Sequence, residues 1–310
     1  MDAGGSRARR DRRDTADSAR RRSPGGAHVQ PLAILCALLV LAAAVAALIA
    51  GGCGADGSAS PPDGGVSPAP PGKQPTAGLR AALMRDDKAI DAVLGYAPFI
   101  ALGGAGHKEI ALTFDDGPGP TTPALLDYLK ADGVPATFFL VGRAVAQHTD
   151  VVRREVEAGF AVGSHSESHG RLASRTKADQ EDEILTTADR ITRISRHAVR
   201  LFRPPYGSYD ARTLEILHAE RMLMVLWSID PRDYAATRPR QIVAAALKAA
   251  RPGAIVLLHD GPGARPKTLA AVRMLVPALR RRGYRLVSLP ELLRDDPPPR
   301  RQPTPRGEGA

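Results

Sequence analysis

Short apolar runs alternate with longer amphipathic segments over residues 107–294, and this alternation limits the fold more than any other feature of the chain. Seven runs are strand-like, and six segments between them carry Leu, Ile, Val and Ala at helical spacing. Strands that alternate with helices form parallel sheets, because each helix returns the chain to the start of the next strand. We therefore predict an α/β fold, a distorted (β/α) barrel of about seven strands, with an open doubly wound sheet as the alternative.

The predicted elements have the following positions. The strand-like runs are 109–114, 136–141, 160–163, 199–202, 223–229, 254–258 and 285–289. The helical segments are 122–132, 150–158, 178–196, 209–220, 239–251 and 266–282. In the segment 178–196 one face is apolar and the opposite face is charged, the apolar residues being Ile184, Leu185, Ala188, Ile191 and Ile194.

Polar residues with catalytic potential follow five of the seven runs. In parallel α/β folds the functional groups gather at the carboxyl ends of the strands. Scattered structural residues would not sort themselves in this way, so we expect these side chains to meet at one end of the barrel. They are Asp115 and Asp116, His165 and His169, Arg203 and Tyr206, Asp230 and Asp233, and His259.

The spacing of His165 and His169 indicates a metal site. On a helix, residues four apart lie on one face and can share a cation. With a nearby carboxylate they form a set of three protein ligands with open positions, which is typical of a catalytic metal. Nitrogen and oxygen ligands without thiolate favour Zn²⁺, with Co²⁺, Ni²⁺ or Mn²⁺ as alternatives. Two unrelated surface histidines are the other interpretation of this spacing.

Two adjacent aspartates, Asp115 and Asp116, end the first run just before a Gly-Pro-Gly-Pro turn. One carboxylate can bind metal while the other accepts a proton from water. Successive strand residues point to opposite sides of a sheet, so a straight strand cannot deliver both, and the turn allows the backbone to redirect one of them. The alternatives are a helix N-cap with a spare acid, or a phosphate-transferring aspartate, which needs a second aspartate where Gly117 stands.

The N-terminal region is typical of a segment that directs export and membrane attachment. Residues 31–50 are apolar and uncharged, which is enough to span a bilayer, and the basic segment 1–30 predicts a cytoplasmic N-terminus. Residues 31–50 are either a transmembrane helix (a signal anchor) or the apolar part of a lipoprotein signal whose Cys53 receives lipid. Both interpretations place the domain outside the cytoplasm, tethered to the membrane. The other predicted segments are a disordered linker at 51–79, a lead-in at 80–106 and a disordered tail at 295–310.

Cysteine usage and charge exclude several classes of protein. The two cysteines, Cys36 and Cys53, precede the predicted domain, which excludes a disulfide or a Cys-based zinc site within it. The formal net charge of +10 weakly favours acidic polymers or anionic surfaces. Nucleic acid is not a predicted partner, because the domain has no helix-turn-helix, no RNA-binding aromatic signature and no concentrated basic run.

Five motifs, in this order, resemble those of the polysaccharide deacetylase family, also called the NodB-homology family or carbohydrate esterase family 4. The motifs are TFDDGP, HSESH, RPPYG, DPRDY and LLHDG, and the resemblance covers residues 107–294. Members fold as distorted (β/α) barrels and remove acetyl groups from N- or O-acetylated sugars with a divalent metal. The resemblance therefore implies a metal-dependent hydrolase that acts on non-peptide carbon–nitrogen bonds.

The resemblance also implies a role for each matching residue. Asp115 would be the general base, held in place by Arg203, and His259 the general acid, oriented by Asp233. The implied metal ligands are Asp116, His165 and His169. The implied substrate contacts are Pro205, the backbone N–H of Tyr206, Leu257 and Tyr234.

Tyr234 is a departure from the family pattern, because tryptophan usually ends the fourth motif. A tyrosine still offers a flat face for a sugar, so we predict altered substrate preference with activity retained. Trp227 is predicted to be a core residue. The remaining histidines that we considered are predicted to lie at the surface, namely His107, His148, His197 and His218.

The predicted substrate is a GlcNAc-containing polysaccharide that loses its N-acetyl groups. Cell-wall peptidoglycan is the first candidate and a chitin-like glycan the second, because the predicted tether, spacer and basic surface suit a protein that works in the cell wall. The alternatives are an O-acetyl esterase on xylan or another acetylated glycan, and a wall-binding module without catalysis.

Overall fold

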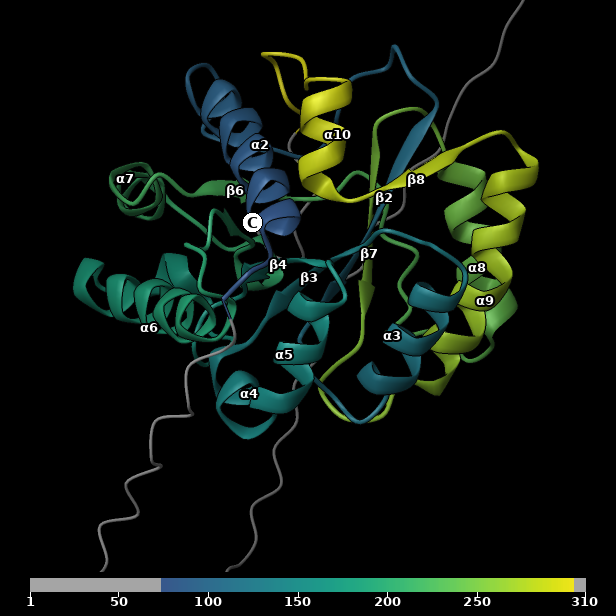
Figure 1. Cartoon of the computed structure of the whole chain (residues 1–310), viewed down its shortest axis with the longest axis horizontal. Coiled ribbons are helices and arrows are strands. Elements are labelled where there is room, and N and C mark those ends of the chain that lie inside the picture. Colours follow the sequence, from purple (N-terminus) through teal and green to yellow (C-terminus); the bar gives the residue numbers. More distant parts are fainter. Residues whose placement is uncertain (1–73, 304–310) are drawn as a thin grey trace, which may run out of the picture. The chain divides into compact units, whose positions relative to one another are not determined.

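The order of the strands decides which loops of this chain meet. In the computed structural model, which describes residues 74–303, eight parallel strands form one sheet in the order β1-β6-β5-β4-β3-β2-β7, with β8 also paired to β2 (Figure 1). The strands are β1 (Phe99–Ile100), β2 (Glu109–Asp115), β3 (Thr137–Leu140), β4 (Ala161–Ser164), β5 (Leu201–Phe202), β6 (Leu223–Val225), β7 (Ala254–His259) and β8 (Arg285–Val287).

Helices connect and cover these strands. They are α2 (Ala77–Leu94), α3 (Thr122–Ala131), α4 (Gly142–Gln147), α5 (Thr149–Glu157), α6 (Lys177–Ser195), α7 (Ala211–Ala219), α8 (Pro239–Ala249), α9 (Pro266–Arg281) and α10 (Leu289–Asp295), with short 3₁₀ turns η1 (Leu172–Ser174) and η2 (Pro205–Gly207). All seven predicted strands and all six predicted helices are present. The elements that the sequence did not predict are β1, α2, α4 and α10.

The sheet curls so that its two ends approach each other. Single bridges join Leu102, just after β1, to Ala254 of β7, and Ile229, just after β6, to Val256 of β7. The predicted distorted (β/α) barrel is therefore confirmed, as a strongly curled parallel sheet, and the open doubly wound alternative is wrong. The physical reason is that both faces of the strands are apolar, so the inner face is buried by curling and the outer face by helices.

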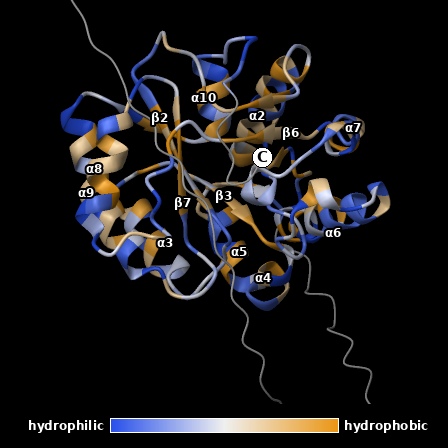
Figure 2. Ribbon diagram, turned by 180° about the vertical axis from the view of Figure 1, so that it is seen from behind, coloured by the Kyte–Doolittle hydropathy of each residue, from blue (hydrophilic) through white to orange (hydrophobic). Residues whose placement is uncertain are grey.

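Strand β2 shows how the alternation of residues builds two cores. Ile110, Leu112 and Phe114 belong to the outer core, which packs under the surrounding helices, whereas Ala111 belongs to the inner core. The inner core is covered by α2 and α10, which lie next to each other in Figure 1. Figure 2 shows that the strands are largely apolar, while the surrounding helices carry both apolar and polar residues.

The folded unit extends beyond the predicted domain 107–294. Helix α2 and strand β1 fall within 74–106, and β1 pairs with β6. The described part of the predicted disordered tail is also ordered against β1, because Gln302 Oε1 accepts hydrogen bonds from the backbone N–H groups of Ala101 (2.8 Å) and Leu102 (3.0 Å). A polar, proline-rich segment can dock in this way where a strand edge offers unpaired N–H donors.

The predicted membrane-spanning or signal segment 31–50, Cys53 and most of the predicted linker lie outside the described residues. Within residues 74–303, no helix combines the length and the apolar character needed to cross a bilayer.

Candidate active site

The two adjacent aspartates reach the same site because the backbone turns between them, and both carboxylates approach His165 Nε2 (3.7 and 3.5 Å). Asp115 is the last residue of β2 and is 2% exposed, and it is in register with His259, the last residue of β7. Asp116 has φ = 72°, in the left-handed region that non-glycine residues rarely adopt. The prediction that the turn redirects one carboxylate is thereby confirmed. Strained backbone of this kind is concentrated at functional sites.

Asp116, His165 and His169 form a cluster that can hold a metal ion. One ligand atom from each residue lies within 4.8 Å of the others. Asp116 Oδ1 is 2.9 Å from His169 Nε2 and 3.5 Å from His165 Nε2. Their spacing suggested that the two histidines share a helix, but in the structure they do not. They lie in an irregular loop after β4, in which His169 has φ = 59°.

The chemistry of these three side chains fits a divalent cation. His165 Nδ1 lies 2.7 Å from the backbone carbonyl of Arg203, which can only accept, so Nδ1 carries the proton and Nε2 turns its lone pair toward Asp116. Burial lowers the pKa of His165, which favours the neutral imidazole that binds metal. Asp116 Oδ1 is buried, and its close neighbours include the Nε2 atoms of His169 and His165, so the three donor atoms surround one point where a cation can bind.

The charge on Asp116 is favoured by its neighbours. Burial alone would raise the pKa of this carboxyl, but the nearby His169, His165 and His259 rings outweigh that effect and the pKa is lowered. The carboxylate is therefore ionised at neutral pH, ready to act as a ligand.

A fully buried guanidinium holds Asp115. Arg203 is 0% exposed, and its Nη1 donates to Asp115 Oδ1 (2.7 Å) and to the Thr113 hydroxyl (2.8 Å). Its Nε and Nη2 donate to the backbone carbonyls of Val225 and Leu226, both at 3.1 Å. This bonding fixes one oxygen of Asp115 against the arginine, while the other, Oδ2, lies 3.7 Å from His165 Nε2 on the metal side.

His259 is held by Asp233 on the other side of the site. Asp233 Oδ1 is 2.7 Å from His259 Nδ1, and Asp233 Oδ2 accepts from the His259 backbone N–H (2.9 Å) and the Thr268 hydroxyl (2.7 Å). Burial opposes the positive charge of His259. The Asp233 carboxylate, together with the charges of Asp115 and Asp116, overcomes this and raises the pKa of His259 to about 9. The imidazole is therefore protonated at neutral pH.

These groups open into one cavity of about 520 Å³. Leu257 and the exposed rings of Tyr206 and Tyr234 line it, and the Tyr234 ring meets His259 edge-on at 5.4 Å between centroids. Trp227 packs against the inner core, as predicted, and it also lines this cavity, because the barrel interior ends there. Pro205 is buried and does not line the cavity, so the geometry does not support its implied substrate contact.

Asp230, one of the groups predicted at the strand ends, lines the cavity, and its Oδ2 accepts a hydrogen bond from the Tyr234 hydroxyl (3.2 Å). Sequence reasoning missed several other polar cavity residues. Arg143 and Gln147 lie on α4, and Arg265 follows β7. Arg143 follows the strand-like run 136–141. The expectation that functional groups lie at the carboxyl ends of strands would have found it, had it been applied to that run.

One predicted surface histidine has a partner within the fold. His197 Nε2 lies 3.2 Å from Asp87 Oδ1 on α2. The pairing was invisible in the sequence because α2 was not predicted to pack there.

Comparisons with known proteins agree with this site. The sequence model of the family described as polysaccharide deacetylase matches residues 103–224. A chitooligosaccharide deacetylase from Bradyrhizobium sp. (strain ANU 289) is 41% identical over 201 residues, which cover 61% of this chain and 92% of that protein. A peptidoglycan-N-acetylglucosamine deacetylase from Bacillus cereus is 37% identical over 191 residues, covering 61% of this chain and 89% of that protein.

A solved structure indicates the same family. The crystal structure of a peptidoglycan N-acetylglucosamine deacetylase superimposes with a TM-score of 0.62 at 30% sequence identity, covering 65% of this chain and 95% of that one. The chain belongs to the polysaccharide deacetylase family. It is a hydrolase that acts on carbon–nitrogen bonds other than peptide bonds, and its Asp-His-His cluster is consistent with the divalent metal of that family.

Proposed function

We propose that this protein removes N-acetyl groups from GlcNAc residues of a cell-wall glycan, with peptidoglycan as the substrate. The observation that carries the proposal is one cavity lined by a carboxylate outside the metal-binding cluster, by a protonated imidazole and by the cluster itself. Asp115, fixed by Arg203, stands on one side, and His259, fixed by Asp233, stands on the other.

Zn²⁺ is the proposed cation, held by Asp116, His165 and His169, because two imidazoles and one carboxylate with no thiolate suit it. When bound, it supplies a Lewis acid that polarises the acetyl carbonyl and acidifies water.

The side chains of this chain supply the proton transfers. Asp115 accepts a proton from the water that attacks the acetyl carbon, and Arg203 orients the carboxylate for that step. The backbone N–H of Tyr206, a residue that lines the cavity, donates to the developing oxyanion. His259 then gives its proton to the amine nitrogen as the carbon–nitrogen bond breaks, leaving acetate and a free amine.

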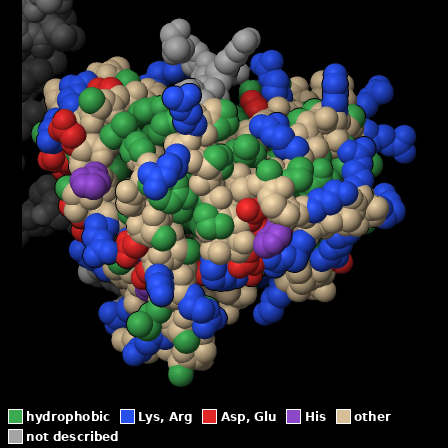
Figure 3. Space-filling view, turned by 90° about the horizontal axis from the view of Figure 1, so that it is seen from above, with side chains coloured by type: hydrophobic (Ala, Val, Ile, Leu, Met, Phe, Trp, Pro, Cys, Tyr) green, Lys and Arg blue, Asp and Glu red, His purple; other side chains and the backbone are tan. Residues whose placement is uncertain are grey.

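The cavity rim supports an anionic glycan. Arg143, exposed on α4, and Arg265, partly buried with its Nε donating to the Gly261 carbonyl (2.8 Å), both line the cavity. Lys and Arg side chains are also spread over the face seen in Figure 3, in agreement with the net charge of +10. Guanidinium groups bind carboxylates in paired hydrogen bonds, and the stem peptides of peptidoglycan carry carboxylates.

A neutral chito-oligosaccharide is the second candidate, because the Bradyrhizobium relative is a chitooligosaccharide deacetylase at 41% identity. The test is acetate release from peptidoglycan, chitotetraose and acetylated xylan, with and without a chelator. We expect chelator-sensitive release and free amines from the first two. Release from xylan alone would favour an O-acetyl esterase, and release from none, with zinc still bound, would favour a wall-binding module.

The Arg143→Ala variant separates the two GlcNAc substrates. We expect the ratio of kcat/KM for muropeptide glycan over chitotetraose to fall about tenfold, the size of one lost charge-assisted contact of about 1.4 kcal/mol. Arg240→Ala, on α8 and away from the cavity, serves as the charge-matched control. An unchanged ratio would contradict the rim's role in selecting an anionic substrate.

We also propose that the domain works outside the cytoplasm, tethered to the membrane by a signal anchor or by lipid on Cys53. Support comes from the sequence of residues 1–53 alone. Mass spectrometry of the mature N-terminus distinguishes the two tethers, because only the lipoprotein begins at Cys53.

A further inference from the structure

Helix α6 carries a buried polar stripe, made of Gln180, Glu183 and Thr187, on its inner face. Their spacing of three and four residues places them on one side of the helix, next to apolar Ile184, and they are 0%, 7% and 0% exposed. Buried polar groups are unfavourable unless they are hydrogen-bonded. The partners of this stripe therefore show why α6 tolerates it.

Glu183 binds the loop between the two histidines of the metal cluster. Its carboxylate accepts hydrogen bonds from the backbone N–H of Ser168 (2.8 Å) and from the Ser168 hydroxyl. Its backbone carbonyl accepts from the Glu167 N–H (2.8 Å). Arg175 Nη2 lies 3.2 Å from both Glu183 Oε1 and Ser168 Oγ, which closes the arrangement. Ser168 directly precedes His169, so these bonds end one residue from a metal ligand.

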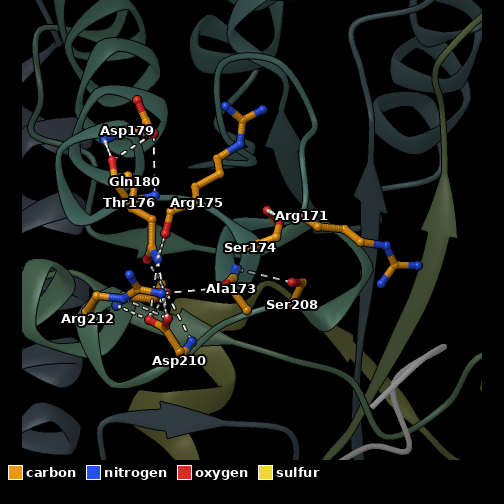
Figure 4. Close-up of polar contacts among 11 residues, drawn as sticks. Arg171, Ala173, Ser174, Arg175, Thr176, Asp179, Gln180, Ser208, Asp210 and Arg212 are labelled. Atoms are coloured by element: carbon orange, nitrogen blue, oxygen red, sulfur yellow. Dashed lines mark hydrogen bonds and ion pairs between the residues drawn. The ribbon is translucent and has the colours of Figure 1, made fainter.

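The other two members of the stripe support the same region. The Thr187 hydroxyl donates to Glu167 Oε2 (3.0 Å), one turn further along α6. Gln180 lies 3.4 Å from the Arg175 carbonyl and from Asp210, the N-cap of α7, as Figure 4 shows. The stripe therefore joins the histidine loop, the segment that leads into α6 and the start of α7.

The histidine loop needs such support because its backbone is strained. Ser166 and His169 have φ values of 65° and 59°, in the left-handed region that is unfavourable for a non-glycine residue. Conformations of this kind persist where surrounding contacts over-determine them. The His169 N–H also donates to Ser166 Oγ (3.0 Å), but that bond lies within the loop and moves with it. Helix α4 also holds the loop, because the backbone N–H groups of Gly142 and Arg143 donate to the carbonyls of Ser166 (3.0 Å) and Glu167 (3.1 Å). The bonds from α6 are those that hold Ser168, the residue next to His169.

We propose that Glu183 is a positioning residue for the metal site, which acts by fixing Ser168 and thereby holds His169 Nε2 next to Asp116. Glu183 contacts no ligand atom of the cluster, so its effect passes through the loop backbone. The inference rests on the metal centre of the proposed function.

The test is a calorimetric titration of the full metal-free chain with Zn²⁺, at a temperature where every variant is folded by circular dichroism. For Glu183→Ala we expect the zinc Kd to rise about tenfold or more, the usual effect of removing a group that orients a ligand. Glu183→Gln should be intermediate, because its amide oxygen still accepts from the Ser168 N–H. The double variant Glu183→Ala/Ser168→Ala should match Glu183→Ala, because the two side chains act through one interaction.

Asp182→Ala is the matched control, because it removes a neighbouring carboxylate of α6 that is exposed. Its zinc Kd should equal that of the wild type. A wild-type Kd in folded Glu183→Ala, or an equal loss in Asp182→Ala, overturns the inference. If Glu183→Ala does not fold, wild-type Kd values in both Glu183→Gln and Ser168→Ala overturn it. A wild-type chain that binds no zinc overturns the proposed function itself, which distinguishes the two failures.

Discussion

Two buried acids of this protein lie in opposite electrostatic surroundings. Asp115, in the barrel interior, is paired with the buried guanidinium of Arg203. Glu155, on the inner face of α5, is fully buried, and no described residue forms a hydrogen bond with either of its carboxylate oxygens. Burial, with a smaller contribution from the charge of Asp260, raises the pKa of Glu155 well above its ordinary range.

The difference shows where this fold retains buried charge. A charged group in a low-dielectric interior is stable only with a counter-charge or several hydrogen bonds, and otherwise it becomes neutral. Around Arg203 the chain supplies four such bonds, because the proposed reaction needs an ionised base. Around Glu155 it supplies none, and the acid is held protonated. The variants below test this contrast.

Replacing the paired acid should have the largest effect on activity. For Asp115→Asn we expect kcat to fall about 10²–10⁴-fold, the usual contribution of a general base. The variant should be less stable, because the buried Arg203 loses its counter-charge, but it should stay folded at the assay temperature, since the amide oxygen can still accept from Arg203. The measurement is acetate release from the preferred glycan, with the melting temperature as the control. Wild-type release would contradict the role assigned to Asp115.

Replacing the partner of that acid should have the largest effect on stability. Arg203→Met leaves Asp115 buried without its counter-charge, which we expect to lower the free energy of unfolding by about 3–5 kcal/mol. Urea unfolding measures this loss. The double variant Arg203→Met/Asp115→Asn should recover part of it, because the uncompensated charge is gone. Equal losses in the single and double variants would show that Arg203 stabilises the fold by packing alone.

The second paired acid should control the pH dependence. His259 donates its proton as imidazolium, so activity should fall as pH rises through its pKa of about 9. This fall is the alkaline limb of the pH profile, and a cation bound in the cluster would move it to lower pH. In Asp233→Asn the carboxylate that raises the pKa of His259 is lost, while the burial that lowers it remains. The alkaline limb should therefore move to lower pH by a further unit or more. The pH profile of kcat tests this, and an unmoved limb would exclude His259 as the titrating acid.

The unpaired acid should give the smallest effect, and in the opposite direction. Glu155→Leu removes an unsatisfied buried carboxyl, which should stabilise the fold by about 1–3 kcal/mol. A raised pKa in the folded state means that the wild type loses stability as pH rises above the unfolded value near 4.5, by about 1.4 kcal/mol per pH unit until the folded pKa is reached. The gain should therefore be larger at pH 7 than at pH 5. A constant difference in melting temperature would show that Glu155 is ionised in the fold.

The candidate site was largely predictable because parallel strands bring their carboxyl ends together. Once the run 109–114 and the later runs were identified as strands, Asp116, His165 and His169 had to approach each other, and the structure confirms that they do. The spacing of the histidines suggested a helix, which was wrong. The sequence pattern reports which residues are near, while the loop conformation depends on contacts from α6 that lie far along the chain.

Other features could not be predicted because their cause is non-local. The polar residues Gln180 and Glu183 fall beside the apolar stripe of 178–196 and would be read as its solvated edge, since their partners are distant in sequence. Trp227 lies in an apolar run and was predicted to be a core residue. It does pack against the core, but only the curl of the sheet places it at the cavity as well.

By itself, the sequence determined the order of strands and helices, the family, and the identity of the groups that meet at the strand ends. Those properties follow from local periodicity and from the fixed direction of parallel strands. Only the tertiary structure decided which acid is paired and which is not, how the histidine loop is supported, and that residues before 107 and after 294 complete the fold. Each of these depends on long-range burial, because a buried group is stabilised by whatever packs against it.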